Sequence, residues 1–442
     1  MSTIEKHDMT QGKILLPLVS FTIPLVLGNL FQLTYNAADS VIVGKYVGEQ
    51  ALAAVGTSTP IMNIAILLIS GMCMGASVLM SSQYGAKDYD TLSRQISTTM
   101  LAGCGFSVVF SLLMLLLANP VLRLIRVPET AIPEAAAYLR IIFMGLIFTF
   151  MYNFLANTMR ALGDSKTPLY FLVTSAFLNI FGDLFFVVVL RWGVAGSAIA
   201  TVCSEGLCCL LCGIYIKKKI PLLCLGKKWW VFDKSLLGKT VSYGSTSAMQ
   251  QVCLQLGKLI IQSVVNTQGV AVMAAFTAVN RVDDFAYTPQ QNIGHAMTTF
   301  LAQNKGAGHK ERMKKGFQTG LLIELVYSIG LFCVIWGLAP QIMTLFAEDG
   351  DAQVVSLGIS YLHLISWMYI LPGLTNGVQG FFRGIGDLKV TLYSTFMNMF
   401  GRVVAVFVMI RLLQMEFASL AWANMVGWIV MLLFEIPLLV KS

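Results

Sequence analysis

Long apolar segments follow one another along almost the whole chain, separated by short stretches that carry charged residues or Pro and Gly. A helix needs about 20 mostly apolar residues to cross the hydrocarbon core of a bilayer. The pattern therefore predicts an all-α integral membrane protein with twelve transmembrane helices in two pseudo-symmetric bundles of six. We expect these spans at residues 14–43, 51–82, 96–118, 133–159, 167–190, 194–216, 236–265, 271–302, 316–338, 353–380, 388–410 and 417–440.

The composition agrees with the pattern and excludes an ordinary soluble domain. Of the 442 residues, 56% are hydrophobic and only 12% are charged. Most Lys and Arg residues fall in the amino terminus, the even-numbered loops and the carboxy terminus, so we expect both termini in the cytoplasm. This topology accounts for the net charge of +8, and we expect no nucleic-acid site. The first apolar run is too long for a signal-peptide core, and we expect it to remain as the first span.

Matching motifs indicate that the chain contains two copies of one unit. The pattern Arg-x-x-Gly-Asp begins at Arg160 in the first half and at Arg383 in the second, and Asn-x-Phe-Gly begins at Asn179 and at Asn398. These and weaker matches occur in the same order at a nearly constant offset, which chance explains poorly. Six spans per half is an even number, so both halves enter the membrane from the same side and the repeats are parallel.

The repeat predicts two lobes with a connection between them. We expect an amino-terminal six-helix lobe at residues 1–216, a basic cytoplasmic linker at 217–235 and a carboxy-terminal six-helix lobe at 236–442. A cleft between two such lobes can open to either side of the membrane when they rock, which is the geometry of alternating access.

The first apolar segment contains a single charged residue, Asp39. Its position toward the end of a long helix places it in the outer half of the membrane. Gln32 and Tyr35 precede it by seven and four residues, so all three side chains lie near one helix face. An ionisable group at membrane depth costs free energy unless it is paired or hydrated, which indicates a functional residue. The alternative is a carboxylate at the helix end that is simply hydrated.

Further polar residues share helix faces in the fifth and sixth spans. Asn179 and Asp183 are four residues apart and lie on one face of the fifth span. A carboxylate surrounded by amide and hydroxyl oxygens can hold Na⁺, and a desolvated carboxylate can instead take up a proton. The alternative is a structural polar pair. Glu205 follows Thr201 by four residues and belongs either to this site, to the cleft, or to a hydrated helix end.

A polar stripe along the seventh span suits the wall of a hydrated cleft. Gln251, Gln255 and Lys258 recur at three- and four-residue spacing. Lys258 can instead pair with an acid of the eighth span, at Asp283 or Asp284. The isolated acids of the ninth and twelfth spans, at residues 324 and 435, are interpreted as structural or interfacial.

The order of these motifs resembles that of the multidrug and toxic compound extrusion (MATE) family of secondary transporters, from about residue 13 to 440. The matching pieces include Asp39 with Val-Ile-Val-Gly after it, both Arg-x-x-Gly-Asp loops, and the run Gln-Asn-Lys-Gly-Ala-Gly that begins at Gln303. The resemblance implies a cation site in the amino-terminal lobe. Its residues would be Asp39, Asp183, Asn179, Thr201, Asn153 and Asn157.

The resemblance also implies a function. It predicts antiport of small amphipathic, often cationic compounds across a bacterial cell membrane, driven by an inward proton or sodium gradient, by a monomer with no cofactor and no resident metal. No phosphate-binding loop or catalytic cluster is present, so we expect neither ATP hydrolysis nor an enzyme. Some branches carry a second site with acids on helices seven and ten. Gln250 or Gln251 and Pro372 stand at those places here, so we expect that site to be absent.

Two alternatives remain open. A flippase for lipid-linked precursors would need a strongly basic cleft to hold a pyrophosphate, and the spans contain few basic residues. A non-transporting membrane scaffold would not need carboxylates at membrane depth.

Overall fold

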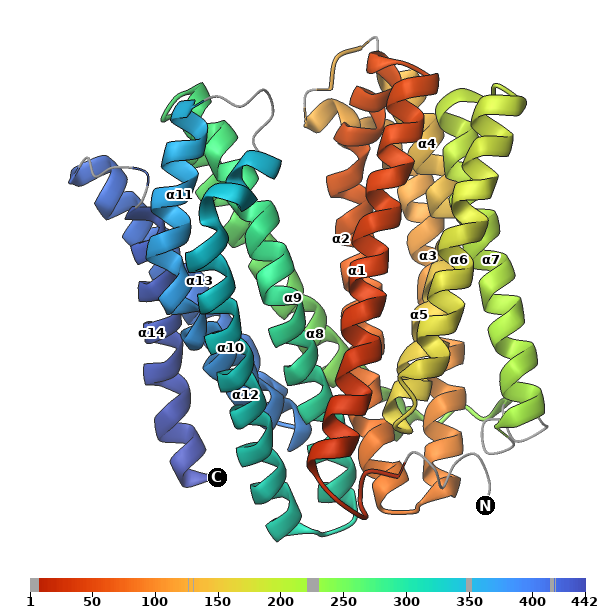
Figure 1. The fold of residues 1–442 in the computed structure, drawn as a ribbon. Helices are drawn as coiled ribbons and strands as arrows, with labels where there is room; N and C mark the ends of the chain where they lie inside the picture. The colour runs from red at the N-terminus through yellow and green to blue at the C-terminus, as the bar shows by residue number, and fades with distance from the viewer. Residues whose placement is uncertain are drawn as a thin grey trace. The chain divides into compact units, whose positions relative to one another are not determined.

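The computed structural model is helical throughout (Figure 1) and describes residues 8–125, 127–129, 131–220, 230–346, 352–413, 417 and 419–442. Every predicted span coincides with one helix or with consecutive helices. The elements are α1 (Leu15–Tyr46), α2 (Glu49–Gly85), α3 (Tyr89–Leu124), α4 (Ile132–Met144), α5 (Leu146–Ala161), α6 (Lys166–Asp183), η2 (Leu184–Val189), α7 (Gly193–Lys219), α8 (Lys234–Val265), α9 (Val270–Gly306), α10 (Lys310–Phe346), α11 (Ala352–Ser366), η6 (Trp367–Tyr369), α12 (Ile370–Gly384), α13 (Leu388–Val406), η7 (Phe407–Leu412) and α14 (Ser419–Lys441).

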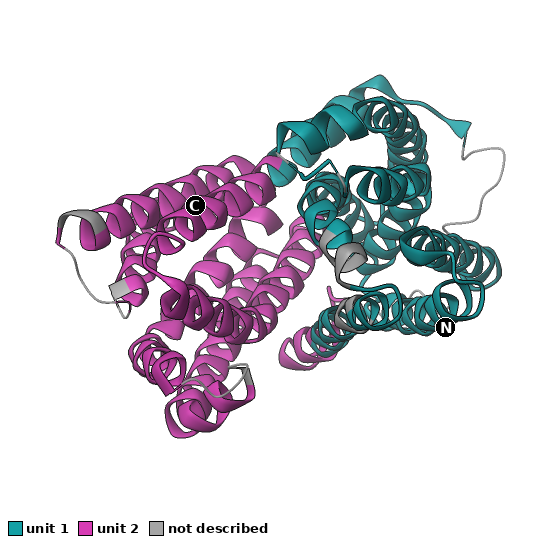
Figure 2. Ribbon diagram, turned by 90° about the horizontal axis from the view of Figure 1, so that it is seen from above, with its two compact units in different colours: residues 1–8, 23–248 teal, residues 9–22, 249–442 magenta. Residues whose placement is uncertain are grey.

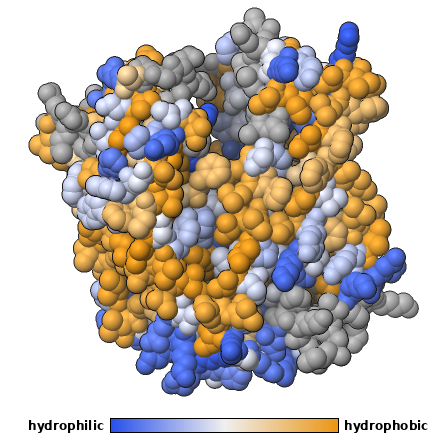
Figure 3. Space-filling view, in the orientation of Figure 1, coloured by the Kyte–Doolittle hydropathy of each residue, from blue (hydrophilic) through white to orange (hydrophobic). Residues whose placement is uncertain are grey.

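Most of these helices have the length and composition of membrane spans. Within the described ranges, nine helices are long and apolar enough to cross a membrane, and ten if the bent pair α4 and α5 counts as one span. Helices α8 and α9 are long but carry more polar residues, which lowers their mean hydropathy. Large apolar side chains such as Leu116 and Phe181 are exposed on the helix surfaces, and hydrophobic residues cover much of the face shown in Figure 3. Such a surface is suited to lipid rather than to water.

Several predicted spans are interrupted by local changes of helix geometry. Helices α4 and α5 meet at Gly145 with a bend of 46°. A Cβ at Gly145 would lie 2.3 Å from a methyl group of Val202 on α7, so a larger residue would prevent this close approach. Helix α6 continues into the π-helix η2, and α13 continues into the π-helix η7.

The chain divides into two compact units (Figure 2). Unit 1 comprises residues 1–8 and 23–248, and unit 2 comprises residues 9–22 and 249–442. The divisions fall inside α1 and α8, so each of these helices contributes to both units. The predicted linker at 217–235 lies partly outside the described residues, which omit 221–229.

Corresponding features recur in the two halves of the chain. The π-helices follow Asp183 in the first half and Val406 in the second. Glycines with positive φ precede α2 and α9, at Gly48 (φ 113°) and Gly269 (φ 102°). The local geometry therefore agrees with the internal repeat that the sequence motifs indicate.

Helix α2 packs very closely against the part of α8 that belongs to unit 1. A Cβ at Gly71 would lie 2.5 Å from the Cα of Ala248, and a Cβ at Gly75 would lie 2.5 Å from the carbonyl carbon of Tyr243. Two glycines four residues apart are a frequent means of bringing membrane helices into backbone contact. These positions of α2 therefore require glycine.

Candidate functional site

Two carboxyl groups from distant parts of the sequence meet inside unit 1. Asp39 lies on α1 and Asp183 is the last residue of α6, and their carboxyl groups are within hydrogen-bonding range of each other. The Ser197 hydroxyl of α7 donates a hydrogen bond of 2.8 Å to Oδ1 of Asp39. Asp183 is 0% exposed, and neither of its carboxyl oxygens accepts a hydrogen bond from a donor group among the described residues. The pair is therefore incompletely satisfied by the protein.

Asn179 and Thr201 link the two helices beside this pair. The Asn179 amide donates to the Thr201 hydroxyl over 3.2 Å, and the Thr201 hydroxyl donates to the backbone carbonyl of Ser197 over 3.2 Å. Asn179 is 3% exposed. The predicted residues Asp39, Asp183, Asn179 and Thr201 thus lie in one connected polar cluster.

The local backbone explains how Asp183 is positioned. A Cβ at Gly182 would lie 3.0 Å from the Cβ of Ala200, so the glycine allows α6 to approach α7 closely at this point. The π-helix η2 begins directly after Asp183. Single π-turns inside helices are frequent at functional sites, because they shift the register of the following side chains.

Two tyrosine side chains lie near the carboxyl pair. The phenol of Tyr138 on α4 is buried within electrostatic range of Asp39, Asp183 and Glu205. Tyr35 on α1 bonds with Gln32 and interacts electrostatically with Asp39 and Glu205. The sequence did not indicate Tyr138, because no spacing rule relates it to the acids.

Glu205 is the third acid of this region. Its Oε2 accepts a hydrogen bond of 2.5 Å from the Thr149 hydroxyl of α5. The side chain is therefore held by a neighbouring helix and is not simply hydrated at a helix end. Within the described part of the chain, no three His, Cys, Asp or Glu side chains converge as a metal site.

Other predicted residues make no described hydrogen bond to either carboxyl group of the pair. The amides of Asn153 and Asn157 each donate to the backbone carbonyl four residues earlier in α5, at 2.9 and 2.8 Å. Gln32 is exposed on α1, and Gln251 and Gln255 are half-buried on α8.

Lys258 forms an ion pair with an acid of the following helix. Its Nζ lies 3.4 Å from Oδ1 of Asp284, and both side chains are more than half exposed. The expected alternative pairing with Asp284 is therefore confirmed. Asp283 instead accepts hydrogen bonds from the hydroxyls of Tyr361 and Tyr369.

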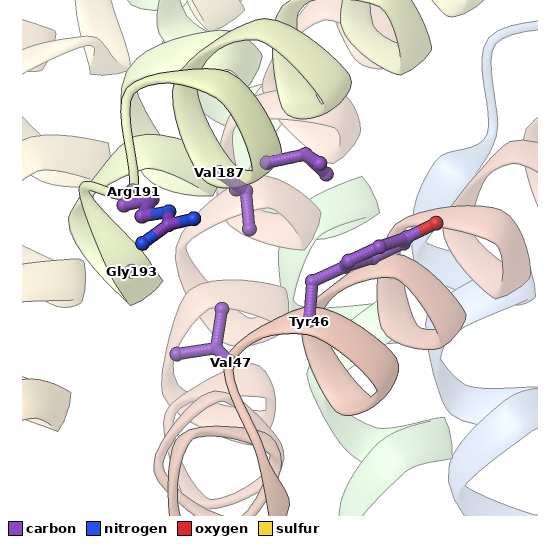
Figure 4. A pocket seen from close by; sticks show the side chains of 6 residues that line it. Tyr46, Val47, Val187, Arg191 and Gly193 are labelled. Atoms are coloured by element: carbon purple, nitrogen blue, oxygen red, sulfur yellow. The ribbon is translucent and has the colours of Figure 1, made fainter.

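A cavity of about 450 Å³ lies between the end of α1, the end of η2 and the start of α7 (Figure 4). Tyr46 follows Asp39 by about two turns, Val187 follows Asp183 by one turn, and Gly193 precedes Ser197 by one turn. At 1.5 Å per residue, the cavity lies about 6–10 Å from the carboxyl groups along the helices. Its lining residues are Tyr46, Val47, Val187, Val188, Arg191 and Gly193.

The MatE family model matches residues 24–185 and 247–409 of this chain, one match in each half. The chain is 32% identical over 392 residues to the probable multidrug resistance protein YpnP of Bacillus subtilis, which covers 88% of this chain and 86% of that protein. It is 23% identical over 423 residues to the probable multidrug resistance protein NorM of Thermotoga maritima, with 93% and 89% covered.

Solved structures with the same fold include a MOP superfamily transporter from Pyrococcus furiosus. The TM-score is 0.92 at 21% identity, with 100% of this chain and 98% of that chain covered. A multidrug resistance MATE family transporter in an outward-facing conformation matches with a TM-score of 0.91 at 21% identity, with 99% and 97% covered. These likenesses confirm the predicted membrane fold of about twelve helices.

Proposed function

Because the chain belongs to the MatE family of multidrug efflux transporters, we propose that it is an antiporter that exports small amphipathic, often cationic compounds in exchange for a monovalent cation. The family is cation-coupled. The observation that carries the proposal is the approach of the half-buried Asp39 carboxyl group to the fully buried carboxyl group of Asp183.

A buried pair of carboxyl groups needs a positive partner. Two ionised carboxylates repel each other, and removing them from water costs several kcal/mol per charge. No described Lys or Arg lies within ion-pair distance of either acid. A bound monovalent cation offsets one of the two negative charges, and the direct contact between the two groups favours a proton, because one shared proton replaces repulsion with a hydrogen bond.

Coupling requires that the cation distinguishes between two conformations. A ligand shifts an equilibrium only through its different affinity for the two states. In the proposed cycle, cation binding at Asp39 and Asp183 favours the state that releases substrate outward, and cation release into the cytoplasm restores the other state. One charge that crosses a potential of 100 mV provides about 2.3 kcal/mol, which supports a substantial substrate gradient.

The experiment is accumulation of ethidium in everted membrane vesicles, with proton and sodium gradients imposed separately. The wild type is compared with Asp39→Asn and Asp183→Asn, and with Asp90→Asn as a control, because Asp90 is an exposed acid at the start of α3. We expect accumulation in the wild type and in the control, and its loss in both site variants. The gradient that drives accumulation identifies the ion. Equal accumulation in all four proteins contradicts the proposed site.

A further inference from the structure

A second buried carboxyl group, Glu324, lies in unit 2 on α10. It is 1% exposed, and neither of its carboxyl oxygens accepts a hydrogen bond from the described part of the chain. No described basic side chain lies within ion-pair distance of it. A structural carboxylate in such a position would normally have donors around it, because an unpaired buried charge is very costly.

The other buried acids of unit 2 lie in the field of a positive charge. Asp283 accepts hydrogen bonds from the hydroxyls of Tyr361 and Tyr369, and the charge of Arg402 acts on it. Both carboxyl oxygens of Glu435 lack a described hydrogen-bond partner, as those of Glu324 do, but the charge of Arg383 acts on Glu435. Glu324 therefore differs from both in that no described positive charge acts on it.

Helix α12 packs closely against Glu324 because residue 373 on α12 is glycine. A Cβ at Gly373 would lie 2.9 Å from Oγ of Ser328, 3.2 Å from Nε2 of Gln290 and 3.4 Å from Oε2 of Glu324. Polar atoms of α9 and α10 thus meet the backbone of α12 beside the Glu324 carboxyl group. Gln290 also has an Oε1 atom without a described hydrogen-bond partner.

We propose that Glu324 is a second proton-binding site, at the close approach of α12 to α10 beside Gly373. A proton neutralises the carboxylate and turns one of its oxygens into a donor, which removes the cost of an unpaired buried charge. The exchange is simple protonation, in which Glu324 takes a proton from water and later returns it.

The groups beside Glu324 favour a proton over a metal cation. Gln290 presents its amide nitrogen on this side, since Nε2 donates to Ser328 Oγ at 3.1 Å and to the Tyr369 carbonyl at 2.8 Å. A nitrogen donor repels Na⁺, which prefers several oxygen ligands. No cluster of three acidic, His or Cys side chains surrounds Glu324 within the described ranges.

None of the described groups that face Glu324 carries a charge that would change its proton affinity. They are Gln290 of α9, Ser328 and Tyr327 of α10, and Gly373 of α12. Tyr327 is the titratable group among them, and no described charged side chain of α9, α11 or α12 acts on Glu324. Its proton should therefore bind independently of the Asp39 and Asp183 pair. Its use in transport rests on the proposed function.

Infrared difference spectroscopy of the purified full-length protein tests the binding itself. Spectra are recorded between mildly acidic and mildly alkaline pH, and the carbonyl stretch of protonated carboxylic acids is followed. We expect a band that is present in the wild type and in Asp183→Asn and is lost in Glu324→Gln. Because no substrate or gradient is needed, this result is independent of the antiport mechanism.

Two further variants keep the test decisive if Glu324→Gln does not fold. Ser328→Ala removes a hydroxyl one helical turn from Glu324, and Gly373→Ala forces a methyl group against Ser328, Gln290 and Glu324. We expect both to retain the carboxyl band and to shift its frequency. A spectrum that is identical in all variants, or a band that does not change with pH, overturns the proposal.

Transport then shows whether this proton moves during the cycle. We expect Glu324→Gln to accumulate ethidium while exchanging fewer protons per ethidium than the wild type, whereas Asp183→Asn loses accumulation. An unchanged ratio of protons to ethidium in Glu324→Gln overturns a role for this proton in transport. If only Asp183→Asn loses accumulation, the result supports the site at Asp39 and Asp183 and does not bear on proton binding at Glu324.

Discussion

At the scale of single residues, Ser197 is the hydroxyl that fixes the geometry of Asp39. Its hydrogen bond to Oδ1 of Asp39 joins α7 to α1, and the Thr201 hydroxyl bonds to its backbone carbonyl. Helix α7 therefore contacts both acids of the pair, directly at Asp39 and through Asn179 beside Asp183. The serine is thus expected to adjust cation affinity without carrying the cation.

Ser197→Ala tests this adjustment. A hydrogen bond to a charged group contributes about 1.5–3 kcal/mol, so we expect the apparent cation affinity to change by about tenfold to 150-fold while transport persists. The measurement is ethidium accumulation as a function of the driving-ion concentration. Ser204→Ala is a matched control, because Ser204 lies on the same helix but donates only to the Thr201 carbonyl. An unchanged ion dependence in Ser197→Ala would refute the role of this hydroxyl.

Sequence spacing accounts for part of the candidate site. The interval between Asn179 and Asp183 places them on one helix face, and the family resemblance predicts that Asp39 belongs to the same site. Ser197 precedes Thr201 by four residues, which places it on the same face of its own helix but does not relate it to Asp39, and no spacing rule relates Tyr138 to the acids. Both reach the acids through tertiary packing, which the periodicity of one helix does not contain.

At the scale of helices, the apolar pattern predicts where each span lies but not how its backbone is bent. The predicted span 133–159 is two helices that bend at Gly145, and the span 167–190 ends in the π-helix η2. Hydropathy depends on composition along the chain, whereas a bend or π-turn depends on the neighbour that the helix contacts.

The close packing of α2 on α8 gives a prediction for these glycines. Gly75→Ala places a methyl group 2.5 Å from the backbone of Tyr243, so the helices must separate. Overpacking of this kind costs about 1–3 kcal/mol, and we expect a lower Tm in a thermal-shift assay of the purified protein. Gly56→Ala on the same helix meets nothing within 4 Å and should leave Tm unchanged or raise it slightly. Equal Tm values for both variants would argue against close packing at Gly75.

At the scale of the whole molecule, the repeat was the strongest signal in the sequence. The two matches to the MatE model fall one in each half, as the motif order predicted. The predicted lobe boundaries at 216 and 236 remain expectations, because the compact units divide inside α8. The sequence does not distinguish proton coupling from sodium coupling, because the same oxygen ligands suit both ions.

Competition between cation and substrate is expected if antiport uses one conformational equilibrium. A coupling free energy of about 1–3 kcal/mol corresponds to a change in affinity of about 5-fold to 150-fold. Ethidium should therefore bind the purified wild type more weakly at acidic pH, or in high Na⁺ if sodium is the driving ion. Fluorescence titration measures this affinity, and Asp183→Asn should bind ethidium with an affinity that the cation no longer changes. Wild-type binding that is insensitive to both ions would contradict coupling through a shared equilibrium.

The most direct measurement compares two modes of transport in proteoliposomes that contain Asp183→Asn. In counterflow, unlabelled substrate inside the vesicles exchanges for labelled substrate outside without any cation gradient. In driven uptake, an imposed cation gradient must concentrate the substrate. If the carboxyl pair couples the cation to the cycle, the variant retains counterflow and loses driven uptake. Driven uptake at the wild-type level would show that Asp183 does not couple transport.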